Sequence, residues 1–293
     1  MATIERESLR ARSRARNRTL PALPRLAWDR LVLMLLALLV VYPLWEIVRV
    51  SLLDVSEVRR PGASIWPLDL GAYVEAWVGI PFPRYMLNSL IVTLAVTLGN
   101  TLTAVLAAYA FSRTEFFGRE LLFLLVIGSL MIPSHVTLIP NYLTFAGWGM
   151  LDTHAALILP FLASGFSVFF LRQYMLGIPK ELDEAARIDG AGLWTILWTI
   201  MVPLSWPAIS VVALFAFMSQ WNEFIWPLLS TSSEEMRTIQ IGLRYLLRDQ
   251  EEGGSPDWPL VMAGTMIALM PLLIAYLVAE RHLIRGITMG SFR

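Results

Sequence analysis

The 293-residue chain contains no cysteine, three histidines and a single lysine, Lys180. The absence of cysteine excludes disulfides, thiolate metal ligands and a cysteine nucleophile. The histidines are far apart in the sequence, and no H-E-x-x-H pair occurs. The chain also lacks a G-x-x-x-x-G-K-[ST] phosphate-binding loop. We therefore expect no catalytic residue, no metal site and no cofactor within this chain, and no hydrolysis of ATP by it.

Charged residues are scarce as well. They make up 16% of the chain, against about 25% in soluble domains, and 56% of the residues are hydrophobic. Six apolar segments approach the roughly 20 residues that cross a hydrocarbon core. They are residues 31–53, 86–112, 121–140, 155–174, 204–228 and 260–279. We predict an all-α, polytopic membrane protein with six transmembrane helices, the third broken by Pro133 and Pro140.

The basic residues predict the orientation of these spans. Eight arginines occupy residues 1–30, and this stretch could be read as a nucleic-acid arm or a signal sequence. It is long for a signal, and no small-residue cleavage site follows it, so we interpret it as a basic cytoplasmic tail and expect no nucleic-acid partner. With the tail inside, cytoplasmic segments hold sixteen basic residues and external segments six. The bias places both termini inside and residues 54–85 and 231–258 outside.

A short polar segment between two apolar spans stands out. Within residues 177–191 we predict a helix of about nine residues and about 13 Å, with Pro179 suited to its first turn and acidic residues near its N-terminus, where they complement the helix dipole. Gly190 then permits a turn with positive φ. One face of this helix comprises Leu182, Ala185, Ala186 and Asp189. Such a helix is too short to be stable alone in water. It could be an ordinary surface helix, but we favour a docking site for a soluble partner.

The spacing in this segment resembles a known family. Glu184-Ala185-Ala186 is followed by Gly190, and then by Ile200, Val202 and Pro203. This pattern resembles the EAA loop of ATP-binding cassette (ABC) importer permeases, with Val202 where the family pattern has leucine. Further matching stretches are Phe117-Gly118-Arg119, Phe170-Leu171-Arg172, Trp221-Asn222-Glu223 and Met262-Ala263-Gly264. Over roughly residues 30–290 the chain is similar to the carbohydrate branch, and there to the second permease subunit of maltose-type systems.

The resemblance implies a site and a set of partners. Residues 31–285 would form the permease domain, and residues 177–203 its coupling loop. The loop residues expected to contact an ATPase subunit are Glu184, Ala185, Ala186, Asp189 and Gly190. A cytoplasmic tail, residues 286–293, would also reach the ATPase through Gly286, Gly290 and Arg293, although its Ser-Phe-Arg ending differs from the usual family tail.

The implied partners are a second homologous permease subunit, an ABC ATPase dimer that binds ATP and Mg, an extracytoplasmic sugar-binding protein and membrane lipid. The implied location is the bacterial plasma (inner) membrane, crossed several times.

Polar residues inside predicted spans are functional candidates by default. Gln220, Asn222 and Glu223 cluster late in the fifth predicted span. They could line or gate a translocation pathway, or form a polar cap at the membrane interface. In the first span, Glu46 and Arg49 have i,i+3 spacing and are expected to neutralise each other.

The resulting functional hypothesis is one half of the pathway of a binding-protein-dependent sugar importer, with an oligosaccharide as the favoured cargo. A polyol or glycerol phosphate importer is the alternative, and a membrane scaffold or membrane enzyme ranks lower. The sequence identifies neither the sugar nor the residues that contact it.

Overall fold

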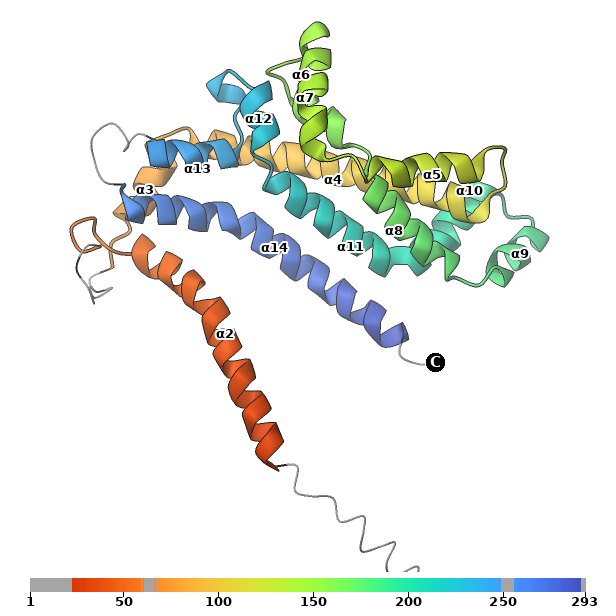
Figure 1. Ribbon diagram of the computed structural model, residues 1–293, viewed down its shortest axis with the longest axis horizontal. Helices are drawn as coiled ribbons and strands as arrows, with labels where there is room; N and C mark the ends of the chain where they lie inside the picture. Colours follow the sequence, from red (N-terminus) through yellow and green to blue (C-terminus); the bar gives the residue numbers. More distant parts are fainter. Residues whose placement is uncertain (1–22, 59, 61–65, 67, 249–255, 291–293) are drawn as a thin grey trace, which may run out of the picture. The chain divides into compact units, whose positions relative to one another are not determined.

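The computed structural model describes residues 23–58, 60, 66, 68–248 and 256–290, and every regular element in this part of the chain is helical (Figure 1). The all-α prediction is confirmed. The α-helices are α2 (Leu23–Ser51), α3 (Gly71–Val78), α4 (Phe82–Arg113), α5 (Arg119–Ser129), α6 (Leu138–Gly147), α7 (His154–Ile158), α8 (Gly165–Leu176), α9 (Glu181–Ile188), α10 (Leu193–Ile196), α11 (Val202–Trp221), α12 (Ile225–Ser230), α13 (Ile239–Arg248) and α14 (Trp258–Gly290). Shorter 3-10 segments are η1 (Ser134–Thr137), η2 (Leu159–Phe161) and η4 (Glu234–Met236), and η3 (Leu197–Met201) is a π-helical segment.

The chain divides into two units, Met1–Arg49 and Val50–Arg293. In the first unit, the described structure is the apolar helix α2. Its Arg49 side chain forms an ion pair with Glu46 at 2.8 Å, as the i,i+3 spacing predicts. The pair leaves this helix with no net charge near its end.

The second unit is built around α4. Helix α4 packs against α11 and α8, and α11 packs in turn against α14 (Figure 1). Small side chains permit the close packing: Ala104 and Ala108 of α4 are fully buried. Gly99 serves the same purpose, because a Cβ there would overlap the side chain of Leu162. Thus α4 sits against the segment between η2 and α8.

Two of the predicted spans are broken. Helix α5 ends at Ser129, and the chain from Ser134 to Gly147 leaves it at 94°. Pro133 is extended, with ψ of 133°, and Pro favours an extended conformation in the residue before it, so the break was expected here. Pro140 causes no break, because it lies in the first turn of α6. The second break, of 41°, separates His154–Phe161 from Gly165–Leu176 and was not predicted.

Four described helices are long and apolar enough to cross a membrane, and the count reaches six if each bent pair is one span. Six spans therefore stay a prediction. The fifth predicted span is displaced: one continuous helix runs from Leu193 to Trp221. The predicted coupling loop, residues 177–203, consequently contains α9, α10, η3 and the first residues of α11.

Candidate functional site

Helix α9 forms as the sequence predicts. It spans Glu181–Ile188 and carries its three acidic residues in the first turn and Arg187 in the last. Gly190 has a φ of 82°. Its N–H donates to the carbonyl of Arg187, and the N–H of Ala191 donates to the carbonyl of Ala186. These two bonds form a Schellman motif, which requires the left-handed residue. A Cβ at residue 190 would meet nothing within 4 Å. The positive φ, rather than a lack of space, is therefore the reason for glycine at this position.

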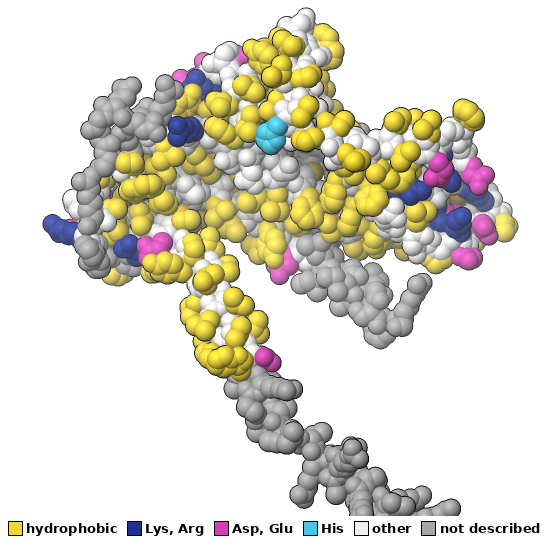
Figure 2. All heavy atoms as spheres, in the orientation of Figure 1, with side chains coloured by type: hydrophobic (Ala, Val, Ile, Leu, Met, Phe, Trp, Pro, Cys, Tyr) yellow, Lys and Arg dark blue, Asp and Glu magenta, His cyan; other side chains and the backbone are white. Residues whose placement is uncertain are grey.

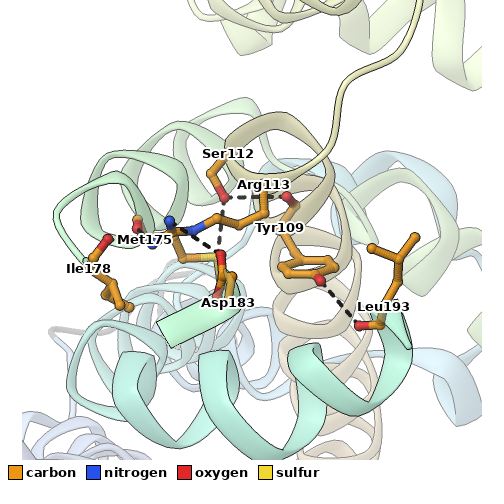
Figure 3. Close-up of polar contacts among 7 residues, drawn as sticks. All are labelled: Tyr109, Ser112, Arg113, Met175, Ile178, Asp183 and Leu193. Carbon is orange, nitrogen blue, oxygen red and sulfur yellow. Dashed lines mark hydrogen bonds and ion pairs between the residues drawn. The ribbon is translucent and has the colours of Figure 1, made fainter. Parts of the chain in front are cut away.

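A buried arginine ties α9 to the rest of the protein, and the sequence reasoning missed it. Arg113, in the last turn of α4, forms an ion pair with Asp183 of α9 at 3.3 Å. The two side chains are 2% and 7% exposed. The other Nη of Arg113 donates to the carbonyls of Met175 and Ile178 at the end of α8 (Figure 3). One guanidinium thus joins the ends of α4, α8 and α9.

This cluster is incompletely hydrogen-bonded. Nε and Nη1 of Arg113 and Oδ1 of Asp183 are buried and have no hydrogen-bond partner among the described residues. Nearby, the hydroxyl of Tyr109 donates to the carbonyl of Leu193, which holds the start of α10 against α4 (Figure 3). A buried ion pair with unused donors and acceptors contributes little net stability. Its presence suggests a role other than stability.

The faces of α9 are distinct. Asp183 is buried and Ala186 is half-buried against the core formed by α4, α8 and α11. Leu182 is 43% exposed and Ile188 86% exposed, and Ala185 is exposed as well. Of the predicted face, Leu182, Ala185 and Asp189 are therefore open to a partner, whereas Ala186 turns partly toward its own chain. Figure 2 shows acidic and basic side chains gathered at this end of the second unit and a mainly hydrophobic surface beyond it.

The three candidate pathway residues behave differently from one another. Helix α11 ends at Trp221, so Asn222 and Glu223 lie beyond it. The Asn222 amide donates to the carbonyl of Met218 in the last turn of α11. A Glu223 carboxylate oxygen accepts the backbone N–H of Trp226 at 3.0 Å and caps α12. Of the three, Gln220 is the one among the described residues that line the polar cavity described next.

This polar cavity has a volume of about 540 Å³. Its walls come from α4, the end of α5, the segments between helices at both breaks, the start of α8, and α11. The polar side chains among the lining residues are Asn100, Ser129, Ser134, Ser164, Ser167, Ser219 and Gln220. The Ser167 hydroxyl donates to the Asn100 amide oxygen at 2.8 Å. No ionisable side chain is among the residues that line the cavity.

Other candidate positions are less informative. Gly286 and Gly290 lie in the last turns of α14, and Arg293 lies outside the described residues. Among the described residues no cluster of three or more His, Cys, Asp or Glu side chains could hold a metal ion. A second hollow, of about 560 Å³, lies between α4, α11 and α14, and its lining is almost entirely apolar.

Residues 99–289 match the family described as binding-protein-dependent transport system inner membrane component. The chain belongs to this family of permeases. It is 33% identical over 266 residues to the sn-glycerol-3-phosphate transport system permease protein of Brucella abortus (strain 2308), which covers 88% of this chain and 94% of that protein. It is 31% identical over 264 residues to the arabinooligosaccharides transport system permease protein of Halalkalibacterium halodurans, which covers 88% and 93%. These relatives are named as transport permeases and not as enzymes.

The fold also matches solved permeases. The chain superposes on a chain of a bacterial ABC transporter that imports the acidic polysaccharide alginate, with a TM-score of 0.79 and 23% identity over 90% of this permease and 98% of that chain. A second alginate transporter structure, in complex with a periplasmic protein bound to an alginate pentasaccharide, matches with a TM-score of 0.64 and 17% identity, over 90% and 95%.

Proposed function

We propose that this permease is one half of the translocation pathway of a binding-protein-dependent ABC sugar importer and couples that pathway to a partner ATPase through α9. The observation that carries this proposal is the attachment of α9. This helix has an exposed apolar side chain, Ile188, and is fixed through the buried Arg113 to the end of α4, a helix long enough to cross a membrane, and to the end of α8. The exposed residues Leu182, Ala185 and Ile188 are spaced three apart and so lie next to one another on the helix, and an apolar patch of this kind is what a protein partner buries.

The proposed coupling runs through α4 and α8. A displacement of α9 by the ATPase would act on Arg113, which contacts the ends of both helices. The same two helices meet again at the cavity, where Ser167 bonds Asn100. The two positions on α4 are separated by about 20 Å at roughly 1.5 Å per residue. Because α4 is one continuous helix over this distance, a movement of α9 would be transmitted to the cavity walls.

The remaining partners and the orientation are part of the same proposal. A second permease subunit would complete the pathway, and an ATPase dimer would bind ATP and Mg. An extracytoplasmic binding protein would deliver the sugar, with α9 and both termini on the cytoplasmic side. The tail, residues 286–293, would add a second contact to the ATPase. The name of the Brucella relative keeps glycerol phosphate as the alternative cargo.

The test of coupling uses the exposed side of α9. In Ile188→Asp or Ala185→Asp, a carboxylate buried unpaired at the interface should cost several kcal/mol. At about 1.4 kcal/mol per tenfold, ATPase docking should weaken at least about a hundredfold. The measurements are recovery of the ATPase in a pull-down from mild detergent and sugar uptake by vesicles. Val78→Asp, a change at an exposed apolar residue of α3 in the segment placed outside the membrane, is the control for ATPase recovery. Normal recovery and uptake in both α9 variants would refute the coupling role.

Orientation has its own test, made simple by the absence of native cysteine. A single cysteine in place of Glu184 should resist an impermeant thiol reagent added outside intact cells and react once the membrane is opened. Labelling from outside would reverse the proposed topology.

A further inference from the structure

The polar cavity lies where both broken helical pairs are interrupted. Leu130 and Ser134 line it from the first break, and Ala163 and Ser164 line it from the second. At membrane depth, irregular backbone is tolerated only where protein buries it or where it lines a water-filled cavity. The position of both breaks on one cavity marks it as a polar compartment within an otherwise apolar protein.

The lining offers hydrogen bonds and aromatic faces. The Gln220 side chain is 7% exposed, and its amide is not paired with any described residue, so it has one acceptor and two donor positions to offer. Ser219, beside it, adds a hydroxyl. The rings of Phe166 and Phe215, at 6.2 Å and 88°, present an edge-to-face pair at the same wall. Neutral donors, neutral acceptors and aromatic surface suit a molecule with many hydroxyl groups and apolar C–H faces.

An anionic ligand is the competing occupant, because the start of α8 also lines the cavity and helix N-termini attract anions. However, the Ser164 side chain already accepts the N–H of Ser167 in that first turn. The cavity supplies no arginine, lysine or histidine. A phosphate or carboxylate placed here would lose its hydration without gaining a charged partner from this chain.

We propose that this cavity binds an uncharged sugar and that this permease contributes to substrate selection, discriminating against phosphorylated and acidic sugars. The inference rests on the proposed function as an importer permease. It separates this chain in substrate class from the transporters named for sn-glycerol 3-phosphate and alginate.

Protection of an introduced cysteine tests occupancy. Ser219→Cys is nearly isosteric, and no other thiol is present. In the complete importer, a mixture of unphosphorylated oligosaccharides from arabinan and starch should slow alkylation of this thiol. At about ten times Kd, nine-tenths of the sites are filled and the rate should fall about tenfold. sn-Glycerol 3-phosphate and alginate oligosaccharide should give no protection. Gln173→Cys, on an exposed position of α8 outside the cavity, should be alkylated at the same rate with every probe.

A charge of either sign introduced at residue 220 tests the discrimination between neutral and anionic substrates. With an uncharged substrate, Gln220→Lys and Gln220→Glu both remove the amide and add a poorly solvated charge, so uptake of the neutral oligosaccharides should fall about tenfold or more in each. With an anionic substrate, only the glutamate variant would lose uptake, whereas the lysine variant would retain or improve it. Gln173→Lys and Gln173→Glu are chemically matched controls and should leave uptake within about twofold.

The outcomes distinguish this inference from the proposed function. Recovery of the ATPase with the wild-type chain tests the importer assignment without any substrate. If the ATPase is recovered and either anionic probe protects residue 219, the inference is overturned and the importer assignment stands. Protection by no probe overturns it as well. Protection by the neutral mixture alone, with equal losses in both Gln220 variants, supports it.

Discussion

Helix α4 is held in opposite ways at its two ends. At its last turn, one buried arginine meets one buried aspartate, and several of their polar atoms have no hydrogen-bond partner among the described residues. Near its first turns, mostly uncharged side chains hold the connection between α12 and α13, and Arg84 and Tyr85 add bonds to the Glu235 carbonyl and the Glu234 carboxylate. The Asn88 amide donates to the carbonyls of Glu235 and Arg237, and the Ser89 hydroxyl accepts the N–H of Ile239.

The difference indicates that the two ends of α4 have different roles. Neutral side chain to backbone bonds fix one arrangement, because each donor has its acceptor and any movement breaks several bonds together. A lone charged pair with spare hydrogen-bonding capacity tolerates rearrangement, because a shifted geometry can gain bonds that the present one lacks. We expect the Asn88 end to behave as a fixed support and the Arg113 end as the moving contact.

The largest effect is expected from breaking the charged pair. Asp183→Ala leaves Arg113 buried without its counter-charge, and loss of one partner of such a pair costs about 3–5 kcal/mol. The double variant Arg113→Met/Asp183→Leu removes the unpaired charge and should recover part of this loss, because the carbonyls of Met175 and Ile178 still lose their donor. ATP hydrolysis should no longer drive uptake in it. Thermal unfolding in detergent, followed by tryptophan fluorescence, measures the first effect, and the ratio of sugar imported to ATP hydrolysed measures the second. A double variant with normal coupling would remove Arg113 from the mechanism.

A smaller effect is expected at the other end. Asn88→Leu removes two hydrogen bonds to backbone carbonyls, and unfolding should be easier by about 1–3 kcal/mol. The ratio of sugar imported to ATP hydrolysed should not change, since this end is the fixed support. Asn222→Leu is the control for stability, because the side-chain bond of the exposed Asn222 is local, to the carbonyl of Met218 four residues earlier. A change in the ratio of sugar imported to ATP hydrolysed in Asn88→Leu would contradict the different roles of the two ends.

Next in size is the turn that ends α9. Gly190→Val forces a β-branched residue into the left-handed region, at a cost of about 1–2 kcal/mol. Gly192→Val is a close control, since Gly192 has a φ of −78° and a Cβ there meets nothing within 4 Å. Recovery of the ATPase should drop for the first variant and not for the second. Gly190→Asn should restore much of it, because asparagine tolerates the left-handed conformation. Equal behaviour of both valine variants would show that the turn has no part in docking.

The smallest effect concerns pH at the fixed end. Asp152 Oδ1 accepts the N–H groups of Ser232 and Ser233, both at 3.0 Å. Partial burial alone would raise the pKa of Asp152, but these hydrogen bonds outweigh it and hold the pKa below its usual value. The resulting stabilisation is present above the unfolded-state pKa of about 3.9 and is lost as the pH falls through the lower folded-state pKa. This titration covers roughly pH 5 to 2. Over that range, thermal unfolding should show that the wild type loses more stability than Asp152→Asn. Parallel curves would exclude Asp152 from this support.

The sequence predicted the short helix that ends before Gly190 but not the distant residue that fixes it. The helix at 181–188 and the positive φ of Gly190 follow from neighbouring residues, so the sequence was sufficient to predict them. Asp183 was interpreted only as an acidic residue in a first turn. Its partner Arg113 is 70 residues away, and a single sequence carries no signal that would match them.

The breaks show a second limit, which concerns local signals that are compatible with more than one structure. Pro133 predicts the first break, because proline disfavours a helical conformation in the residue before it. The second is set by Ser164, whose side chain caps α8, and a serine in an apolar run is also compatible with a continuous helix. The end of α11 was missed because the apolar sequence continues past Trp221 into α12. Gln220 was therefore placed among pathway candidates together with Asn222 and Glu223, although only Gln220 reaches the cavity.

The π-helical segment Leu197–Met201 interrupts the otherwise α-helical run from Leu193 to Trp221. Such a segment is equivalent to one extra residue within an α-helix, and one residue corresponds to a rotation of about 100°. If the same residues closed into a regular α-helix, the part after the segment would turn by that angle relative to α10, which Tyr109 holds. Ser219 and Gln220 would then leave the cavity wall. The wider π-helical turn takes up the extra residue, so deletion of the exposed Thr199, which leaves a regular α-helix, should keep both side chains on that wall.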